Sequence, residues 1–440
     1  MLIISMQHRL HVITYLCFLS TCLIAMDVRP QKEVYTPDYH YYHNLDSIDS
    51  DLVELAKHFP NFVQLNKFYH SRFGRSQYLL RLTDFKQGHI KTFYADEENK
   101  QSGYTRLKNQ KIKLLFSYGE HAREFLPVES LFYLLRNLTN GLSPQTDPGS
   151  HARAYSVDIL STFDIYVIVL ANPDGRYFVE TEKNYCWRGT STGTDLNRNF
   201  AWEFGNKGSS GNDRDEEYRG TKAFSEPETE AYTSITQDVE FDLFISFHSG
   251  AQHIYVPYAD TVSKATGREP ENVQQMLELA ATLSVSTKHG YQYGKATKLN
   301  EYTADGTIFD YMAGVRKIPF SLAIELWGPF QHSGPSCFDL FNPASYSLKK
   351  VLEEIHPLYV TLFQYMRRWK ETQLMMAQAK ESSDLLPSMA LGNILLLSVV
   401  VLTVMLAIRG RFAVWRCMSQ KSAHFQRLLT SIFSDGWIRS

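Results

Sequence analysis

Apolar runs of strand length alternate with segments of helical period between residue 39 and about residue 375. Strands are predicted at 112–116, 165–170, 241–247 and 320–324. Helices are predicted at 47–58, 128–138, 270–288 and 347–369. This alternation is typical of an α/β fold in which helices cover both faces of a sheet.

The two ends of the chain have a different character. Residues 1–25 combine a short polar start with an apolar run that ends at Ala25, which predicts a secretory signal peptide, or alternatively an uncleaved anchor. A short N-terminal segment, 26–38, follows before the folded region.

Residues 389–408 contain no charged side chain, and a helix of 20 residues rises about 30 Å, enough to cross a hydrocarbon core. We expect one transmembrane helix here, preceded by a linker at 376–388; a buried core helix is the alternative. The basic tail, 409–440, favours a cytosolic C-terminus. The expected topology is a single-pass type I membrane protein with its folded region luminal or extracellular.

Composition narrows the class of protein. Hydrophobic residues make up 44% and charged residues 21% of the chain, which excludes a disordered protein. Lys and Arg number 45 against 47 Asp and Glu, so no basic field predicts a nucleic-acid partner, and no pattern indicates an oligomeric state.

Cys186 and Cys337 could form a disulfide or remain two free thiols. Asn137 begins a sequon, Asn-Leu-Thr, that a secretory compartment could glycosylate.

Polar or ionisable residues follow each of the four predicted strands. They lie at 121–124, 172–174, 248–249 and 325. Because loops at the carboxyl ends of parallel strands converge on one crevice, we expect these residues to form a site.

His121 and Glu124 are three residues apart, so both side chains can reach one metal ion. The pair is common by chance, but His248 would add a third ligand from another strand end. Two His and one Glu with an open fourth position are typical of a catalytic zinc site, whereas structural zinc sites are closed and rich in Cys.

Seven ordered motifs between residues 39 and 375 resemble the zinc metallocarboxypeptidase family, of the carboxypeptidase A type. They are HAREF (121–125), NPDG (172–175), WRG (187–189), TDLNRNF (194–200), FISFHSG (244–250), EYTADGTIFDY (301–311) and LAIEL (322–326). The resemblance implies that residues 39–375 form a catalytic domain with a mixed central β-sheet.

The resemblance also implies the parts of a catalytic centre. One Zn²⁺ per chain would be bound by His121, Glu124 and His248. Glu325 would be the general base and acid that acts on the water at the zinc, and Arg188 would stabilise the oxyanion. Asp195 would orient the first zinc-binding His; a loop or helix-capping carboxylate is its alternative reading.

Recognition of a free peptide C-terminus follows from the same resemblance. Asn197 and Arg198 would bind the terminal carboxylate, because a guanidinium fork matches that planar anion. Tyr302 would close over the peptide end, and Arg123 would line an outer subsite. Phe309 falls at the position that selects the terminal side chain, which favours an uncharged, hydrophobic residue. Gly250 replaces an aromatic residue of the digestive enzymes.

The sequence therefore predicts a membrane-anchored zinc carboxypeptidase that acts on the C-termini of peptides or proteins. Two alternatives stay open. Residues 189–193 match GxSxG, the nucleophile elbow of serine hydrolases, although no convincing buried strand precedes them. A binding protein that has lost turnover is the other alternative.

Overall fold

The computed structural model describes residues 37–86, 110–328 and 336–434; in the last stretch, side chains are described for 336–382 and 397–411. The predicted signal peptide, 1–25, and most of segment 26–38 lie outside these residues. The chain divides into two compact units, one containing Gln110–Lys370 and the other containing Glu371–Ser440.

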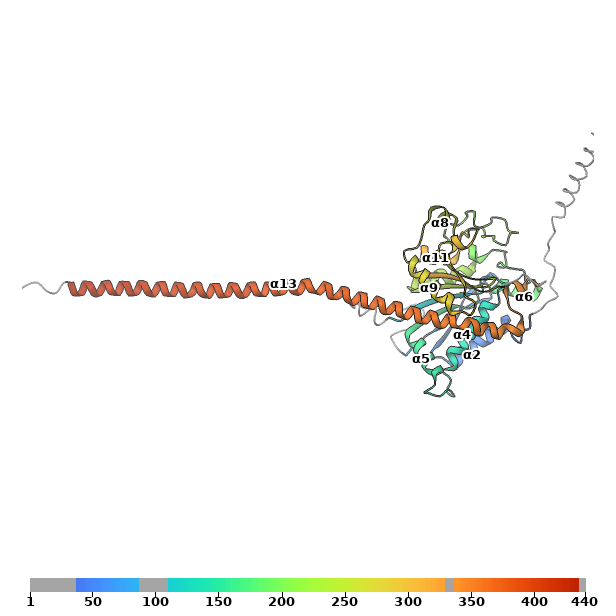
Figure 1. Ribbon diagram of the computed structural model, residues 1–440, viewed down its shortest axis with the longest axis horizontal. Helices are drawn as coiled ribbons and strands as arrows, with labels where there is room; N and C mark the ends of the chain where they lie inside the picture. Colours follow the sequence, from blue (N-terminus) through green and yellow to red (C-terminus); the bar gives the residue numbers. More distant parts are fainter. Residues whose placement is uncertain (1–36, 87–109, 329–335, 435–440) are drawn as a thin grey trace, which may run out of the picture. The chain divides into compact units, whose positions relative to one another are not determined.

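An eight-stranded mixed sheet, in the order β1-β2-β4-β3-β5-β8-β6-β7, forms the centre of the first unit (Figure 1). Its strands are β1 (Val63–His70), β2 (Ser76–Leu82), β3 (Ile112–Tyr118), β4 (Phe163–Ile168), β5 (Leu243–His248), β6 (Ala251–Val256), β7 (Gln292–Lys295) and β8 (Phe320–Trp327). The four central strands, β4, β3, β5 and β8, are parallel, while β2 and β6 pair antiparallel with them. The expected mixed sheet is confirmed.

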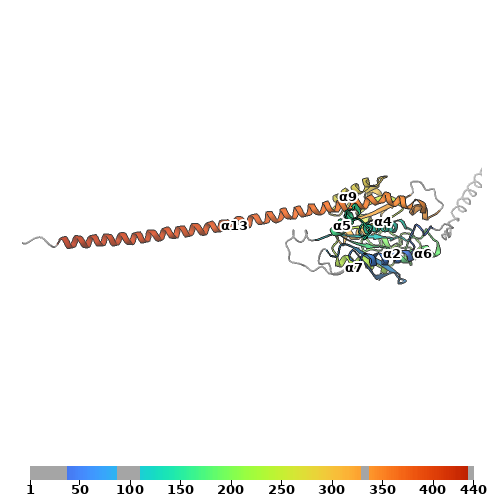
Figure 2. The same ribbon diagram turned by 90° about the horizontal axis from the view of Figure 1, so that it is seen from below.

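Helices cover both faces of this sheet because side chains alternate along each central strand. Leu114 and Phe116 enter one apolar core, and Leu115 between them enters the other. The first core is completed by α2 (Leu45–His58), α4 (Leu126–Asn140), α5 (His151–Thr162), α9 (Val273–Ser286) and the start of α13 (Leu348–Ser434), and the second by α7 (Glu230–Asp238) and α11 (Ile308–Gly314). Figures 1 and 2 show these two layers, with α4 on the opposite side of the sheet from α11 in the first view and from α7 in the second.

The helices vary widely in length. They are α2 (Leu45–His58), α4 (Leu126–Asn140), α5 (His151–Thr162), α6 (Pro173–Glu182), α7 (Glu230–Asp238), α8 (Thr261–Thr266), α9 (Val273–Ser286), α10 (Ala296–Leu299), α11 (Ile308–Gly314), α12 (Phe338–Phe341) and α13 (Leu348–Ser434), with 3-10 turns η1 (Leu196–Arg198), η2 (Pro227–Thr229) and η3 (Ser345–Ser347). The four predicted helices correspond to α2, α4, α9 and the start of α13.

The backbone of the expected linker, 376–388, is helical because α13 continues through it. Among residues with described side chains, we find no helix with the length and apolar character needed to span a bilayer. Residues 389–396 of the predicted span lie outside that set.

Cys186 and Cys337 form a disulfide, with their Cα atoms 5.1 Å apart, which decides between the two alternatives that the sequence left open. The Asn137 sequon lies within α4, where the buried Thr139 hydroxyl donates a hydrogen bond to the Leu135 carbonyl.

Candidate metal centre

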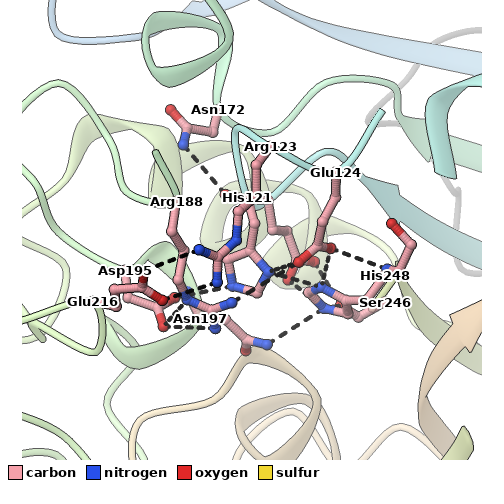
Figure 3. A network of polar contacts seen from close by, with 12 residues as sticks. His121, Arg123, Glu124, Asn172, Arg188, Asp195, Asn197, Glu216, Ser246 and His248 are labelled. Carbon is pink, nitrogen blue, oxygen red and sulfur yellow. Dashed lines mark hydrogen bonds and ion pairs between the residues drawn. The ribbon is translucent and has the colours of Figure 1, made fainter. Parts of the chain in front are cut away.

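Three predicted ligands converge at the carboxyl edge of the central strands (Figure 3). His121 and Glu124 lie in the loop between β3 and α4, and His248 is the last residue of β5. Since β3 and β5 are parallel neighbours, both strands end at the same edge of the sheet. One ligand atom from each residue lies within 4.8 Å of the others, and all three side chains are buried.

The ligand atoms face one another closely. Glu124 Oε1 is 2.7 Å from His121 Nδ1, Glu124 Oε2 is 3.0 Å from His248 Nδ1, and the two Nδ1 atoms are 3.1 Å apart. At this separation the lone pairs of the two imidazole nitrogens would repel each other, so a proton or a metal cation must lie between them. Two nitrogens and a carboxylate are the donor set of catalytic zinc sites, so these residues fit a zinc ion.

The loop that carries His121 is held by backbone geometry and by one asparagine. Gly119 has φ +66°, and a Cβ there would lie 2.6 Å from Leu170, so the turn after β3 requires glycine. The Asn172 side chain donates to the carbonyls of Glu120 and Gly189, and Ala122 N–H donates to the Arg188 carbonyl. The loops of His121 and Arg188 are thereby joined.

Asp195 contacts the far side of the first histidine. Its Oδ1 is 3.1 Å from His121 Nε2 and also accepts a hydrogen bond from Asn197 N–H, so Asp195 contacts the histidine and caps the 3-10 turn η1. Arg188 donates to Asp195 Oδ2 at 3.0 Å. Burial opposes ionisation, but Arg188 and then Arg198 hold the pKa of Asp195 well below its usual range.

Glu325, on β8, adds a further carboxylate to this centre. It is the register partner of His248 on β5, and its buried Oε2 has no hydrogen-bond partner among the described residues. Burial, and then the charge of Glu124, raise the pKa of Glu325 to about 7. A carboxyl group with such a pKa can exchange a proton near neutral pH.

Formal charges at the centre favour a divalent cation. The charged groups are the carboxylates of Glu120, Glu124, Asp195 and Glu325 and the guanidinium groups of Arg188 and Arg198. When all are ionised, two negative charges remain in a largely buried volume. A divalent ion would neutralise them.

Asn197 and Arg198 lie together in η1 beside Asp195. The Arg198 side chain is buried; its Nη1 donates to the Asn197 carbonyl, while its Nε has no partner among the described residues. A buried guanidinium with an unpaired N–H group can accept an anion. Asn197 Oδ1 accepts from Ile308 N–H, which ties η1 to the start of α11.

The other predicted substrate residues differ in exposure. Tyr302 is 63% exposed, whereas Phe309 is buried in the second core. Arg123 forms two contacts of 3.0 Å with Glu216 and lies over the Phe341 ring. A ligand that binds the Arg123 guanidinium must therefore compete with Glu216 for it or bind beside Glu216.

The GxSxG segment has no nucleophile-elbow context. Residues 183–195, which contain it, form turns and irregular backbone, with neither a strand before Ser191 nor an α-helix directly after it. The elbow requires both elements, so the serine-hydrolase alternative has no structural support.

Glu120 and Ser246, which contact His248 Nε2, are not among the site residues predicted from the sequence. Two signals were present in the chain: an acidic residue directly before the first ligand, and a serine two residues before His248 within an apolar strand.

Comparisons with known proteins agree with this geometry. The sequence model of a family described as zinc carboxypeptidases matches residues 48–355. Zinc carboxypeptidase A 1 of Anopheles gambiae is 28% identical over 66% of the chain, and Carboxypeptidase O of Homo sapiens is 30% identical over 50%. These alignments span 60% and 58% of the two relatives. Carboxypeptidase A from Helicoverpa armigera shares the fold, with a TM-score of 0.59 at 22% identity over 80% of each chain.

Proposed function

Because the chain belongs to the zinc carboxypeptidase family, we propose that it hydrolyses the C-terminal peptide bond of peptides or proteins with one zinc ion. The observation that carries this proposal is the cluster of His121, Glu124 and His248 beside the unpaired Glu325 oxygen. The centre holds three metal ligands and one further carboxylate for proton transfer.

Zinc, when bound, supplies a Lewis acid that polarises the scissile carbonyl and acidifies a water molecule. Glu325 accepts the proton of the attacking water and delivers it to the leaving amine, a role that suits its pKa of about 7. Arg188, 3.9 Å from the ligand Glu124, stabilises the negative charge that develops on the carbonyl oxygen. Asn197 and Arg198 bind the free terminal carboxylate, and the exposed Tyr302 closes over it.

We assign the terminal side chain of the substrate to a pocket that includes Phe309. An aromatic residue there offers no charge to pair with Lys or Arg, so uncharged, hydrophobic termini are preferred. Profiling peptides that differ only in the last residue tests this preference. Phe309→Asp should shift release toward basic residues; release of Lys and Arg by the unaltered protein would contradict it.

Two measurements on the purified protein test the activity: metal content, and release of single residues from peptide C-termini. We expect one zinc per chain and release that phenanthroline abolishes and a fluorophosphonate leaves intact. The reverse inhibitor pattern would favour the serine hydrolase. Zinc binding without release from any peptide would favour the binding protein.

We also propose that residues 389–408 anchor the chain in a membrane, with the basic tail cytosolic. Large apolar side chains of α13 from Leu397 to Ile408 are at least 49% exposed, as expected of a surface that contacts lipid. The chain should stay with membranes through alkaline carbonate extraction, and Leu402→Arg combined with Met405→Arg should release it. Extraction of the unaltered chain by carbonate would contradict anchoring.

A further inference from the structure

Glu120 is a buried carboxylate that the reaction described above does not use. It is 1% exposed and directly precedes the ligand His121, yet it contacts the other histidine. Glu120 Oε2 lies 3.1 Å from His248 Nε2, on the opposite side of the imidazole from Nδ1, the nitrogen that faces Glu124. A buried carboxylate in this position needs a structural or chemical reason, because burying a charge is costly.

The hydrogen bonds around Glu120 have a fixed direction. Ser246 Oγ donates to Glu120 Oε1 at 2.8 Å, which uses its only proton. The 2.6 Å contact between Ser246 Oγ and His248 Nε2 must then be donated by the imidazole. This direction places a proton on His248 Nε2, so the neutral ring has its lone pair on Nδ1, which faces Glu124 and His121. Asn197 Nδ2 also faces Nε2, but at 3.4 Å it is a weaker contact.

The Glu120 carboxylate also accepts a second chain of hydrogen bonds, which runs through Ser117. Ser117 Oγ donates to Glu120 Oε1 at 2.6 Å, so the 2.6 Å contact between Ser117 and Tyr232 is donated by the phenol. Ser117 and Ser246 are register partners on β3 and β5, and Tyr232 comes from α7. Both hydrogen-bond chains end on Glu120, and both begin on rigid elements of the fold.

We propose that Glu120 is a positioning residue for the metal: acting through Ser246, it fixes the tautomer and ring orientation in which His248 Nδ1 faces the ion. Asp195 does the same for His121 from the other side of the centre. The inference rests on the proposed zinc-dependent function for the identity of the metal. Carboxylates behind metal-binding histidines fix the ring and raise its basicity.

Replacing Glu120 by Gln tests the tautomer directly. The amide would keep the shape of the side chain, and its NH₂ group could take one of two positions. It would face either His248 Nε2 or the hydroxyls of Ser117 and Ser246. The first arrangement favours the tautomer with the proton on Nδ1, which cannot bind the metal. The second arrangement removes the acceptor to which the Ser246 hydroxyl donates its hydrogen bond.

The experiment measures the zinc dissociation constant of the full chain by competition with a chelator, together with the visible spectrum of the cobalt-substituted protein. We expect Glu120→Gln to weaken zinc binding about 10- to 100-fold and to alter the cobalt spectrum, and Glu120→Asp to restore part of the affinity. Ser246→Ala removes one link without changing the charge and should weaken binding less; it keeps the test open if Glu120→Gln does not fold.

Glu129→Gln is the matched control. Glu129 is also a buried carboxylate that contacts a histidine, with Oε2 2.6 Å from His43 Nδ1, but it lies on α4 and contacts none of the metal ligands among its described hydrogen bonds and ion pairs. Its removal should leave zinc affinity unchanged. Equal zinc affinity of wild type, Glu120→Gln and Ser246→Ala would overturn the positioning role alone, whereas a wild type without zinc affinity would overturn the proposed function as well.

Discussion

His248 and Glu325 are register partners on the neighbouring parallel strands β5 and β8, so the backbone hydrogen bonds of the sheet set the distance between a metal ligand and the proposed base. Neither side chain depends on a flexible loop for its position. Such preorganisation lowers the cost of bringing reacting groups together.

Glu325→Gln should keep zinc and lose turnover. The amide preserves the size of the side chain but cannot accept the proton of the attacking water, so we expect kcat to fall by about 10²- to 10⁴-fold. Metal analysis and peptide kinetics on the same preparation check this. A variant with wild-type kcat would remove Glu325 from the mechanism.

Arg198→Ala should abolish the proposed preference for a free terminal carboxylate. Loss of a buried charge-assisted hydrogen bond predicts a decrease of about 10- to 100-fold in kcat/KM for a free-acid peptide, with little change for the amidated peptide. Arg153→Ala, on α5, is the control and should leave both values unchanged. An undiminished ratio between the two substrates in Arg198→Ala would place the carboxylate site elsewhere.

The stability of the folded protein should depend on pH because the pKa of Glu228 is raised. Burial, and then the charge of Glu226, raise the pKa of Glu228 to about 7 from a reference value of 4.5, and its Oε2 has no partner among the described residues. Protonated Glu228 therefore favours the folded state; this contribution is complete below pH 4.5 and is lost as the pH rises through 7.

Glu228→Gln removes this loss and should stabilise the protein above pH 7, by up to about 3 kcal/mol, with little effect below pH 4.5. Thermal unfolding of both proteins across this pH range is the measurement. Glu230→Gln, at an exposed position two residues away, should give no such gain. A gain of equal size at low and high pH would show that charge on Glu228 is not its source.

The disulfide should contribute strongly to stability because Cys186 and Cys337 are 151 positions apart in the sequence. Closing a loop of this length predicts about 5 kcal/mol in the chain-entropy description. Cys186→Ser combined with Cys337→Ser should lower the unfolding temperature, and a reductant should lower that of the wild type only. Identical melting of the two proteins without reductant would contradict this contribution.

The sequence predicted the centre of the sheet better than its edges. Strands β3, β4, β5 and β8 are buried on both faces and read as continuous apolar runs, so all four were predicted, although β4 begins and ends two residues earlier than the predicted 165–170. The outer strand β7 has the sequence QYGK and no apolar run, and β1 mixes buried and exposed positions. Their pairing comes from tertiary contacts that local pattern does not reveal.

The residues of the candidate site also divide into those that local sequence pattern predicts and those that depend on tertiary contacts. His121, Glu124 and His248 were predicted from their residue types and from their places after apolar strands. Glu120 was missed because an acidic residue in a loop is usually exposed. Its burial depends on Ser117 and Ser246 meeting across two strands, and that register is a property of the folded sheet.

The order of the central strands has a consequence during synthesis. Strand β8 lies beside β5 in the sheet, yet it leaves the ribosome long after the segment that carries His121 and Glu124. A nascent chain that has not yet added β8 lacks Glu325 altogether, so it can carry the metal ligands without the proposed proton acceptor. The proposed peptidase activity, which depends on Glu325, would therefore begin only after β8 has been synthesised.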